Sequence, residues 1–186
     1  MTTNQILENA KFETKALHYG QVIDSDTLSR GVPIYRTSSY IFKNTEHAAN
    51  LFALKELGNI YTRLMNPTQD VLEKRVAALE NGLAALALAS GTSAIFYSII
   101  NICSVGDEIV AANNLYGGTY TMLNDILPQF GIKTKFVNPL EPENFNKAIT
   151  SNTKAIFIET IGNPYLDVLD FDKIAEIAHK NELPLI

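Results

Sequence analysis

Ser90, Gly91 and Thr92 are the residues of this chain whose types and spacing point most directly to chemistry. They follow the apolar run Leu83–Ala89 and precede an apolar stretch with a helical pattern that begins near Ser93. A strand that turns into a helix through small residues leaves backbone N–H groups free at the helix N-terminus, where the helix dipole favours an anion. The glycine also lets a phosphate approach the main chain closely. The segment therefore predicts a phosphate-binding turn, although a turn that merely requires a glycine would have the same sequence.

The common nucleotide-binding glycine patterns are absent around this turn. Neither G-x-x-x-x-G-K-[ST] nor G-x-G-x-x-G occurs there. An unrelated doubly wound nucleotide-binding protein is one alternative interpretation of the chain, and the missing glycine pattern argues against it. The expected ligand is therefore a different phosphorylated molecule.

Other segments add side chains that suit such a ligand. Tyr61 and Arg63 stand two positions apart, so both project to one side of an extended segment, and a guanidinium can form two hydrogen bonds with a phosphate. Tyr116 follows an expected strand, where its ring could stack on a flat cofactor and its hydroxyl could transfer a proton. Asn163 lies in a Gly-Asn-Pro turn. Purely structural explanations remain open: an exposed loop arginine, a hydrophobic wedge, and an asparagine favoured by turn conformation.

The order and spacing of four segments carry a resemblance to a known family. These segments are Tyr61–Thr68, Leu83–Ile95, Leu115–Tyr120 and Glu159–Pro164. Together they resemble the pyridoxal-phosphate enzymes of cysteine and methionine metabolism, the transsulfuration group of fold type I, and the resemblance extends to the last residue. The sequence of residues 56–63 is most similar to that of the O-acetylhomoserine sulfhydrylase branch.

The resemblance implies pyridoxal 5'-phosphate as the cofactor and gives each candidate residue a role. Ser90, Gly91 and Thr92 would hold its phosphate, while Tyr61 and Arg63 would reach the phosphate of a neighbouring subunit. Tyr116 would stack on the pyridine ring and act as the catalytic residue in proton transfer. Asn163 would lie near the 3′-oxygen of the cofactor. Glu159 ends its expected strand, is expected at most to orient its neighbours, and is left outside the site.

The implied reaction replaces the acetyl group of O-acetylhomoserine with sulfide and gives homocysteine, a step of methionine and cysteine biosynthesis. Methionine γ-lyases usually have Cys at the position of Gly118, so the glycine favours a sulfhydrylase over that lyase. Cystathionine γ-synthase, cystathionine lyase and methionine γ-lyase of the same family remain alternatives, as does a non-catalytic piece that needs a partner chain. The expected partners are a small amino-acid substrate and further copies of the chain, in a dimer or tetramer that shares its sites between subunits.

Enzymes of this family are longer than the 186 residues of this chain. The chain is therefore expected to be an N-terminal piece that lacks the Asp facing the pyridine nitrogen, the Schiff-base Lys and the Arg for the substrate carboxylate. No Lys of the chain follows a Ser-x-x or Ser-x-Thr segment at the carboxyl end of an expected strand, so none is a candidate for the Schiff base. The 186-residue chain by itself is expected to be inactive.

Alternating apolar strands and amphipathic helices predict βαβ units with a largely parallel sheet. The fold class is α/β, the first part of the large cofactor-binding domain of a fold type I enzyme. Residues 1–60 are expected to form an N-terminal arm and helix that contact another subunit, and residues 61–186 the incomplete domain. The expected strands cover residues 83–89, 108–112, 133–137, 154–159 and the segment from 184, and the expected helices residues 46–57, 68–80, 93–103, 119–130, 142–149 and 170–181.

The composition narrows the function classes. A net charge of −5 with interspersed signs argues against binding to nucleic acid or a membrane surface. Single Cys103 at the end of an apolar stretch suggests a buried thiol, and the three scattered histidines show no metal-ligand spacing, so no metal is expected. Residues 1–5 have no basic and apolar pattern of a signal peptide. A reducing, cytoplasmic location is the expectation.

Overall fold

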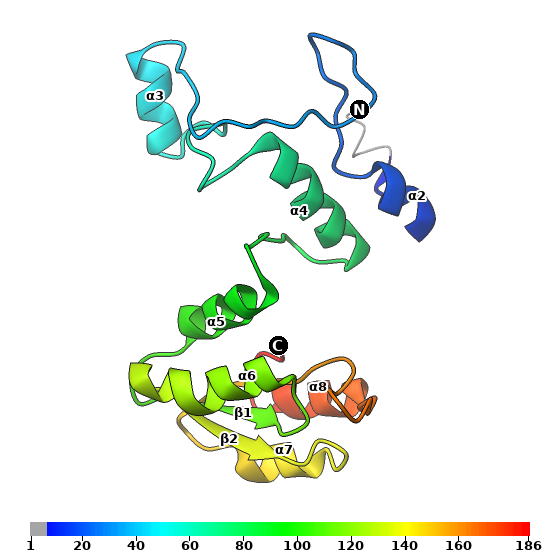
Figure 1. Cartoon of the computed structure of the whole chain (residues 1–186), viewed down its shortest axis with the longest axis vertical. Coiled ribbons are helices and arrows are strands. Elements are labelled where there is room, and N and C mark those ends of the chain that lie inside the picture. The colour runs from blue at the N-terminus through cyan, green and yellow to red at the C-terminus, as the bar shows by residue number, and fades with distance from the viewer. Residues whose placement is uncertain (1–6) are drawn as a thin grey trace. The chain divides into compact units, whose positions relative to one another are not determined.

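The computed structural model describes residues 7–186 and divides into two compact units, Met1–Ala87 and Leu88–Ile186 (Figure 1). The expected boundary at residue 60 separates two roles rather than two compact units, and it stays a prediction. Residues 1–6 of the expected arm lie outside the described residues. They include residues 1–5, on which the expectation of no signal peptide was based.

The first unit contains three described helices, α2 (Phe12–His18), α3 (Thr45–Phe52) and α4 (Pro67–Leu79). Asn44 caps α3 by accepting a hydrogen bond from the His47 N–H at 2.8 Å. The helix expected over residues 46–57 ends about five residues early. Leu54 adopts a left-handed φ of 55°, and the Lys55 N–H bonds to the Asn50 carbonyl at 2.9 Å, which closes the last turn before Gly58 is reached.

Helix α4 confirms the helix expected over residues 68–80. Asn66 caps it by accepting from the Thr68 N–H at 2.9 Å, and Pro67 occupies the first turn, where its missing N–H has no helical partner to lose. The expected apolar face is less buried than its spacing suggests. Leu72 and Val76 are 54% and 40% exposed, and Ala77 is the buried residue of this helix.

The segment Leu83–Ala89 is irregular in the structure, so the strand expected there is wrong for the described chain. A strand exists only through hydrogen bonds to a neighbour, and no described segment forms a ladder with this one. Its backbone is held instead by α4, because the Ala87 N–H donates to the Glu73 carboxylate at 2.8 Å. Leu83 and Leu86 are consequently exposed.

The second unit is built on a parallel sheet of three strands in the order β2-β1-β3. The strands are β1 (Glu108–Ala112), β2 (Lys133–Val137) and β3 (Thr153–Phe157), which confirms the expected strands, with β3 ending two residues early. Strand β1 is central and buried at every position. Leu185 adds a parallel bridge to Ile156 on the free side of β3, in agreement with the strand expected from residue 184.

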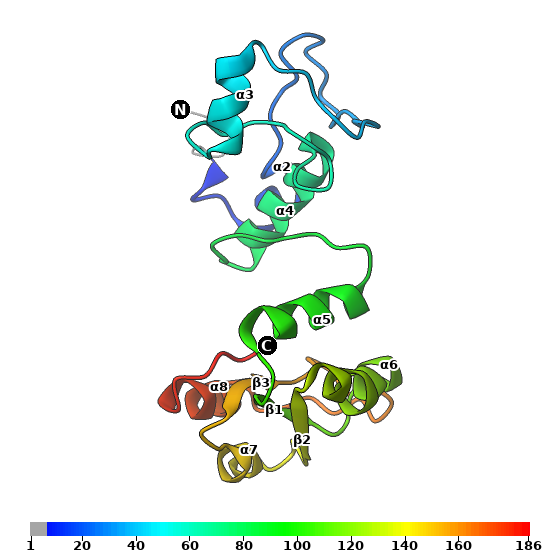
Figure 2. The ribbon, with the colours of Figure 1, turned by 90° about the vertical axis from the view of Figure 1, so that its left-hand side faces the viewer.

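Helices cover both faces of this sheet. They are α5 (Gly91–Ile102), α6 (Gly117–Thr121), a π turn (Met122–Ile126), a 3-10 turn (Leu127–Phe130), α7 (Glu143–Ala148) and α8 (Phe171–Lys180). The crossovers from β1 to β2 and from β2 to β3 run in opposite directions, so right-handed connections put α6 and α7 on opposite faces. Figure 2 shows α6 and α7 on different sides of the strands. Helix α5 packs beside α6, and α8 beside α7.

The helix expected over residues 119–130 begins two residues early and changes character along its length. Pro128 has no N–H and its ring clashes with the carbonyl four residues before it, which is why regular α-helix gives way to the π and 3-10 turns. Met122, Leu123 and Leu127 still reach the core. The core centres on β1 with Ile99, Phe145, Ile156 and Ile174, and it holds the sheet edge on which the candidate site lies.

Candidate cofactor site at the carboxyl edge of the sheet

The carboxyl ends of β1 and β3 lie next to each other, because the two strands pair in parallel. In open α/β sheets, ligands bind beyond these ends, where the chain leaves the sheet in opposite directions. Tyr116 follows β1 by four residues, and Asn163 follows β3 by six. The structure therefore brings two of the predicted site residues to one edge, although they are far apart in sequence.

Tyr116 is the residue that precedes α6, and its backbone is fixed from the neighbouring strand. Its N–H donates to Oε2 of Glu159 at 2.9 Å. Tyr116 is 55% exposed, and its ring lies against Gly118, since a Cβ built on that glycine would come within 2.7 Å of the ring carbon Cε1. A side chain at position 118 would displace the ring. Gly118 and Glu159 together set where the tyrosine points.

Glu159 was left outside the predicted site, and the structure gives it the orienting contact that its strand-end position suggested. The carboxylate is half-buried and its partner lies 43 residues earlier in the chain. A signal for this contact existed in the sequence, because Glu159 ends the expected strand 154–159 and the backbone N–H of Tyr116 follows the expected strand 108–112. Choosing that pair required the strand order, which the sequence alone did not supply.

Asn163 is exposed at the same edge, and its backbone N–H donates to the Asn114 carbonyl at 3.1 Å. The turn is closed by two further bonds, from the Gly162 N–H to the Asp167 carbonyl and from the Leu166 N–H to the Gly162 carbonyl, at 2.9 and 2.8 Å. The peptide bond between Asn163 and Pro164 is cis. The side chain of Asn163 is thus presented by a backbone tied to the end of β1.

The predicted phosphate turn begins α5. Ser90 is its N-cap, with Oγ accepting from the Ser93 N–H at 3.1 Å, and the Ala94 N–H makes the first helical bond to the Ser90 carbonyl. The N–H groups of Gly91 and Thr92 have no acceptor among the described residues. A short link from Ile102 to Glu108 joins α5 to the amino end of β1, so α5 runs antiparallel to the strand and starts on its carboxyl side (Figure 1).

These donors fit a phosphate dianion. A twelve-residue helix directs its positive end at the turn, two N–H groups are free to donate, and a Cβ built on Gly91 would meet no atom within 4 Å. The open space at Gly91 is where an anion could approach the main chain. Ser90 shapes the turn through its cap, as expected, and its hydroxyl also bonds with that of Ser93 at 2.9 Å.

Tyr61 and Arg63 belong to the first unit and line a cavity there with residues 35–38. The Arg63 guanidinium carbon lies 5.5 Å from the Tyr61 ring centroid, a cation–π contact. Both side chains are exposed. A single antiparallel bridge between Ser39 and Tyr61 holds their backbone. In it the Tyr40 N–H bonds to the Ile60 carbonyl at 3.3 Å and the Thr62 N–H to the Ser38 carbonyl at 2.9 Å. The pair thus presents a guanidinium and a phenol on a supported loop.

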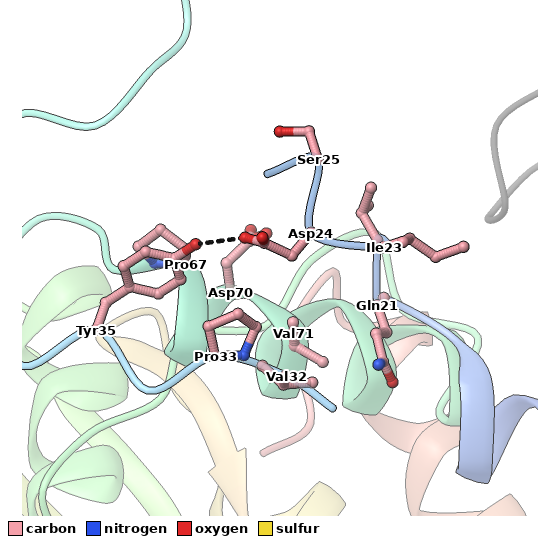
Figure 3. Close-up of a pocket in the computed structure, with 12 residues that line it drawn as sticks. Gln21, Ile23, Asp24, Ser25, Val32, Pro33, Tyr35, Pro67, Asp70 and Val71 are labelled. Atoms are coloured by element: carbon pink, nitrogen blue, oxygen red, sulfur yellow. Dashed lines mark hydrogen bonds between the residues drawn. The ribbon is translucent and has the colours of Figure 1, made fainter. Parts of the chain in front are cut away.

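A second cavity in the first unit contains none of the predicted site residues (Figure 3). Tyr35 reaches over it and its hydroxyl donates to Oδ2 of Asp24 at 3.4 Å. Hydrogen bonds from the Thr27 side chain and backbone lower the pKa of Asp24, whereas desolvation and the charge of Asp24 raise the pKa of Tyr35. These contacts give Asp24 and Tyr35 a structural role, because they hold together two parts of the same loop region.

Two sheet lysines of the second unit are engaged at the amino end of β1. Lys135 pairs with Glu108 at 3.1 Å and Lys154 with Asp107 at 3.8 Å. Cys103 is buried, as expected, and burial raises the pKa of its thiol. Among residues 7–186, no group of three His, Cys, Asp or Glu side chains is arranged to hold a metal ion, and no helix has the length and apolar character needed to cross a membrane.

Comparisons with known proteins cover nearly the whole chain. Residues 13–186 match the sequence model of the Cys/Met metabolism PLP-dependent enzymes. The chain is 57% identical to an O-acetyl-L-homoserine sulfhydrylase of Leptospira meyeri and 51% identical to a homocysteine synthase of Schizosaccharomyces pombe, over 96% and 97% of this chain. It spans 40% and 42% of those two proteins.

Solved structures give the same result. A Campylobacter jejuni protein, assigned as an O-acetylhomoserine (thiol)-lyase and crystallised with N'-pyridoxyl-lysine-5'-monophosphate, matches with a TM-score of 0.91 at 42% identity, over 95% of this chain and 43% of that one. A cystathionine γ-lyase of Lactobacillus plantarum, complexed with L-serine, matches with a TM-score of 0.84 at 34% identity, over 94% of this chain and 43% of that one. The fold is therefore part of a fold type I enzyme.

Proposed function

Since the chain belongs to the Cys/Met metabolism PLP-dependent enzyme family, we propose that its protein is an O-acetylhomoserine sulfhydrylase, in which sulfide replaces acetate and homocysteine is formed. The observation that carries the proposal is the sequence identity of about half or more to proteins named for this activity, over nearly the whole chain. The sheet edge that joins the Tyr116 and Asn163 segments supports it, because hydrogen bonds between the two segments hold these two candidate residues at neighbouring strand ends.

Pyridoxal phosphate, when bound, supplies an electron sink for bonds at the amino-acid carbons. The residues of this chain would hold and orient it. The N–H groups of Gly91 and Thr92 would bind the phosphate, with Ser90 fixing the turn, and Asn163 would donate to the 3′-oxygen of the cofactor. Tyr116 would cover the ring face, and its hydroxyl would hold or move a proton at the departing acetate.

Tyr61 and Arg63 would contribute to the phosphate site of a second copy of the chain, in a homodimer or homotetramer. Support comes from the exposure of both side chains on a hydrogen-bonded loop. A guanidinium there could complete the charge balance of a phosphate that otherwise meets backbone donors. Residues 1–60 would supply contacts between subunits. The buried, unpaired thiol of Cys103 agrees with a reducing compartment such as the cytoplasm.

The test is a direct assay of the protein expressed from its complete gene. The expressed protein is expected to form homocysteine from O-acetylhomoserine and sulfide only when pyridoxal phosphate is present. The same preparation should be given cystathionine and methionine separately, because cleavage of either at a higher kcat/KM would assign a lyase instead. A protein that binds the cofactor and converts none of these substrates would contradict the proposal.

A further inference from the structure

Asn114 is a polar residue that the core almost encloses. It follows β1 by two residues and is only 7% exposed, whereas its neighbour Asn113 is exposed. Burying an amide costs free energy unless its hydrogen bonds are replaced within the protein. The contacts of Asn114 therefore indicate what the buried amide holds in place.

These contacts all go to one turn beyond β3. Nδ2 of Asn114 donates to Oδ2 of Asp167 at 3.1 Å, and its backbone carbonyl accepts from the Asn163 N–H at 3.1 Å. Asp167 in turn accepts the Gly162 N–H on its backbone carbonyl. One residue of the β1 side thus holds both ends of the turn that carries Asn163.

Gly162 shows how closely Asn114 lies against the turn. A Cβ built on this glycine would stand 2.5 Å from Nδ2, 3.0 Å from Cγ and 3.2 Å from the carbonyl oxygen of Asn114. Real Cβ atoms essentially never lie within 3.0 Å of another heavy atom, so any other residue at position 162 would force the Asn114 amide to shift. The asparagine and the glycine form a matched pair.

We infer that Asn114 is a positioning residue that holds the 162–167 turn so that Asn163 is presented to the cofactor. Asn114 lies two residues before Tyr116, so the same strand end carries one candidate cofactor contact and positions another. The inference rests on the proposed function for the role of Asn163. The contact between Asn114 and the turn is independent of that function.

The experiment uses the full-length protein and the substitution Asn114→Asp, which preserves size, removes the N–H donor and sets a carboxylate against that of Asp167. Hydrogen exchange of the 162–167 segment is measured without cofactor, and pyridoxal-phosphate affinity by equilibrium dialysis. Exchange is expected to quicken about fivefold to tenfold, and affinity to weaken by a similar factor. Asn113→Asp is the matched control, because it adds the same charge one residue away, and it should change neither quantity by more than about twofold.

A rescue variant distinguishes positioning from a general loss of stability. N114D/D167N exchanges donor and acceptor across the same 3.1 Å contact, so it is expected to restore both exchange and affinity. Unchanged exchange in Asn114→Asp, or no recovery in the double variant, would overturn the inference. Faster exchange with unchanged cofactor affinity would overturn only the cofactor role of the turn. Absence of homocysteine formation in the wild type would instead refute the proposed function.

If Asn114→Asp fails to fold, Gly162→Ala provides a second route to the same contact. Its methyl group is expected to press on the Asn114 amide, to quicken exchange of the turn and to weaken cofactor binding. Adding Gly162→Ala to Asn114→Ala should then have less effect than in the wild type, because Nδ2 and Cγ are gone. Additive effects of the two substitutions would contradict the matched pair.

Discussion

Replacement of Glu159 should release the backbone of Tyr116 while leaving its ring intact. The bond from the Tyr116 N–H to the Glu159 carboxylate is 2.9 Å long and charge-assisted. Hydrogen bonds to charged groups contribute about 1.5–3 kcal/mol. Glu159 is only half-buried, so screening by water favours the lower end of that range. A loss of about 1.4 kcal/mol corresponds to a factor of ten.

The prediction is therefore that Glu159→Ala quickens hydrogen exchange at the Tyr116 amide by about tenfold. Glu159→Gln keeps an acceptor oxygen without the charge, so its effect should be smaller, about twofold to fivefold. Exchange is measured on the cofactor-free protein, and kcat for homocysteine formation on the loaded enzyme. We expect kcat to fall in the same order, Ala below Gln below wild type, with KM less affected.

Glu176→Ala is the matched control, because it removes an exposed carboxylate from α8 in the same unit. It should leave the Tyr116 amide unchanged. If Glu159→Ala also leaves that amide within about twofold of the wild type, the carboxylate does not hold the residue. If exchange rises and kcat does not fall, Tyr116 is fixed by Glu159 but its orientation does not matter to the reaction.

Three further substitutions test the remaining parts of the reasoning. Arg63→Ala should weaken cofactor affinity tenfold to a hundredfold in equilibrium dialysis, the scale of a lost charge-assisted bond, and unchanged affinity would make Arg63 a surface residue only. Tyr116→Phe should keep near-normal cofactor affinity but lower kcat by about 10², since it removes the hydroxyl and keeps the ring; normal turnover would leave Tyr116 only a stacking role. The Asp24 carboxyl should titrate below its ordinary pKa of 3.8 by NMR, and Thr27→Val should raise the midpoint towards that value. Because folding lowers this pKa, the stabilisation is present above pH 3.8 and is lost as the pH falls through the folded value; a midpoint in Thr27→Val equal to that of the wild type would refute the assignment of its cause.

Local chemistry made most helix starts predictable from the sequence. Four helices are capped by a side-chain oxygen, from Asn44, Asn66, Ser90 and Asp170. Three of these caps lie within two residues of the expected helix start, and Ser90 lies three residues before the expected start at Ser93. Caps involve residues three positions apart at most, so single-sequence reasoning can see them. Helix ends were harder, because Leu54 closes α3 in a left-handed conformation for which glycine is the usual signal.

Features that depend on a distant partner were not predictable in the same way. Residues 83–89 have the composition of a buried strand, but pairing decides whether such a segment becomes one, and composition does not name the partner. Pro128 is a helix breaker that the sequence shows, but here the helical segment continues through it as a π turn and a 3-10 turn. The site followed the same rule: its residues could be proposed from their motifs, whereas the contacts through which Glu159 and Asn114 position them required the strand order.

The two segments at the sheet edge hold each other reciprocally. The Tyr116 N–H, beyond β1, is accepted by Glu159 beyond β3, and the Asn163 N–H, beyond β3, is accepted by Asn114 beyond β1. Both bonds depend on the carboxyl ends of β1 and β3 lying side by side, so the parallel pairing of these two strands is itself a requirement of the candidate site. Because both bonds cross the same pair of strand ends, loosening one turn should also loosen the other. Exchange at the Tyr116 amide in Asn114→Asp, and at the 162–167 turn in Glu159→Ala, would measure that coupling, and strictly local effects in both variants would show that the two turns are held independently.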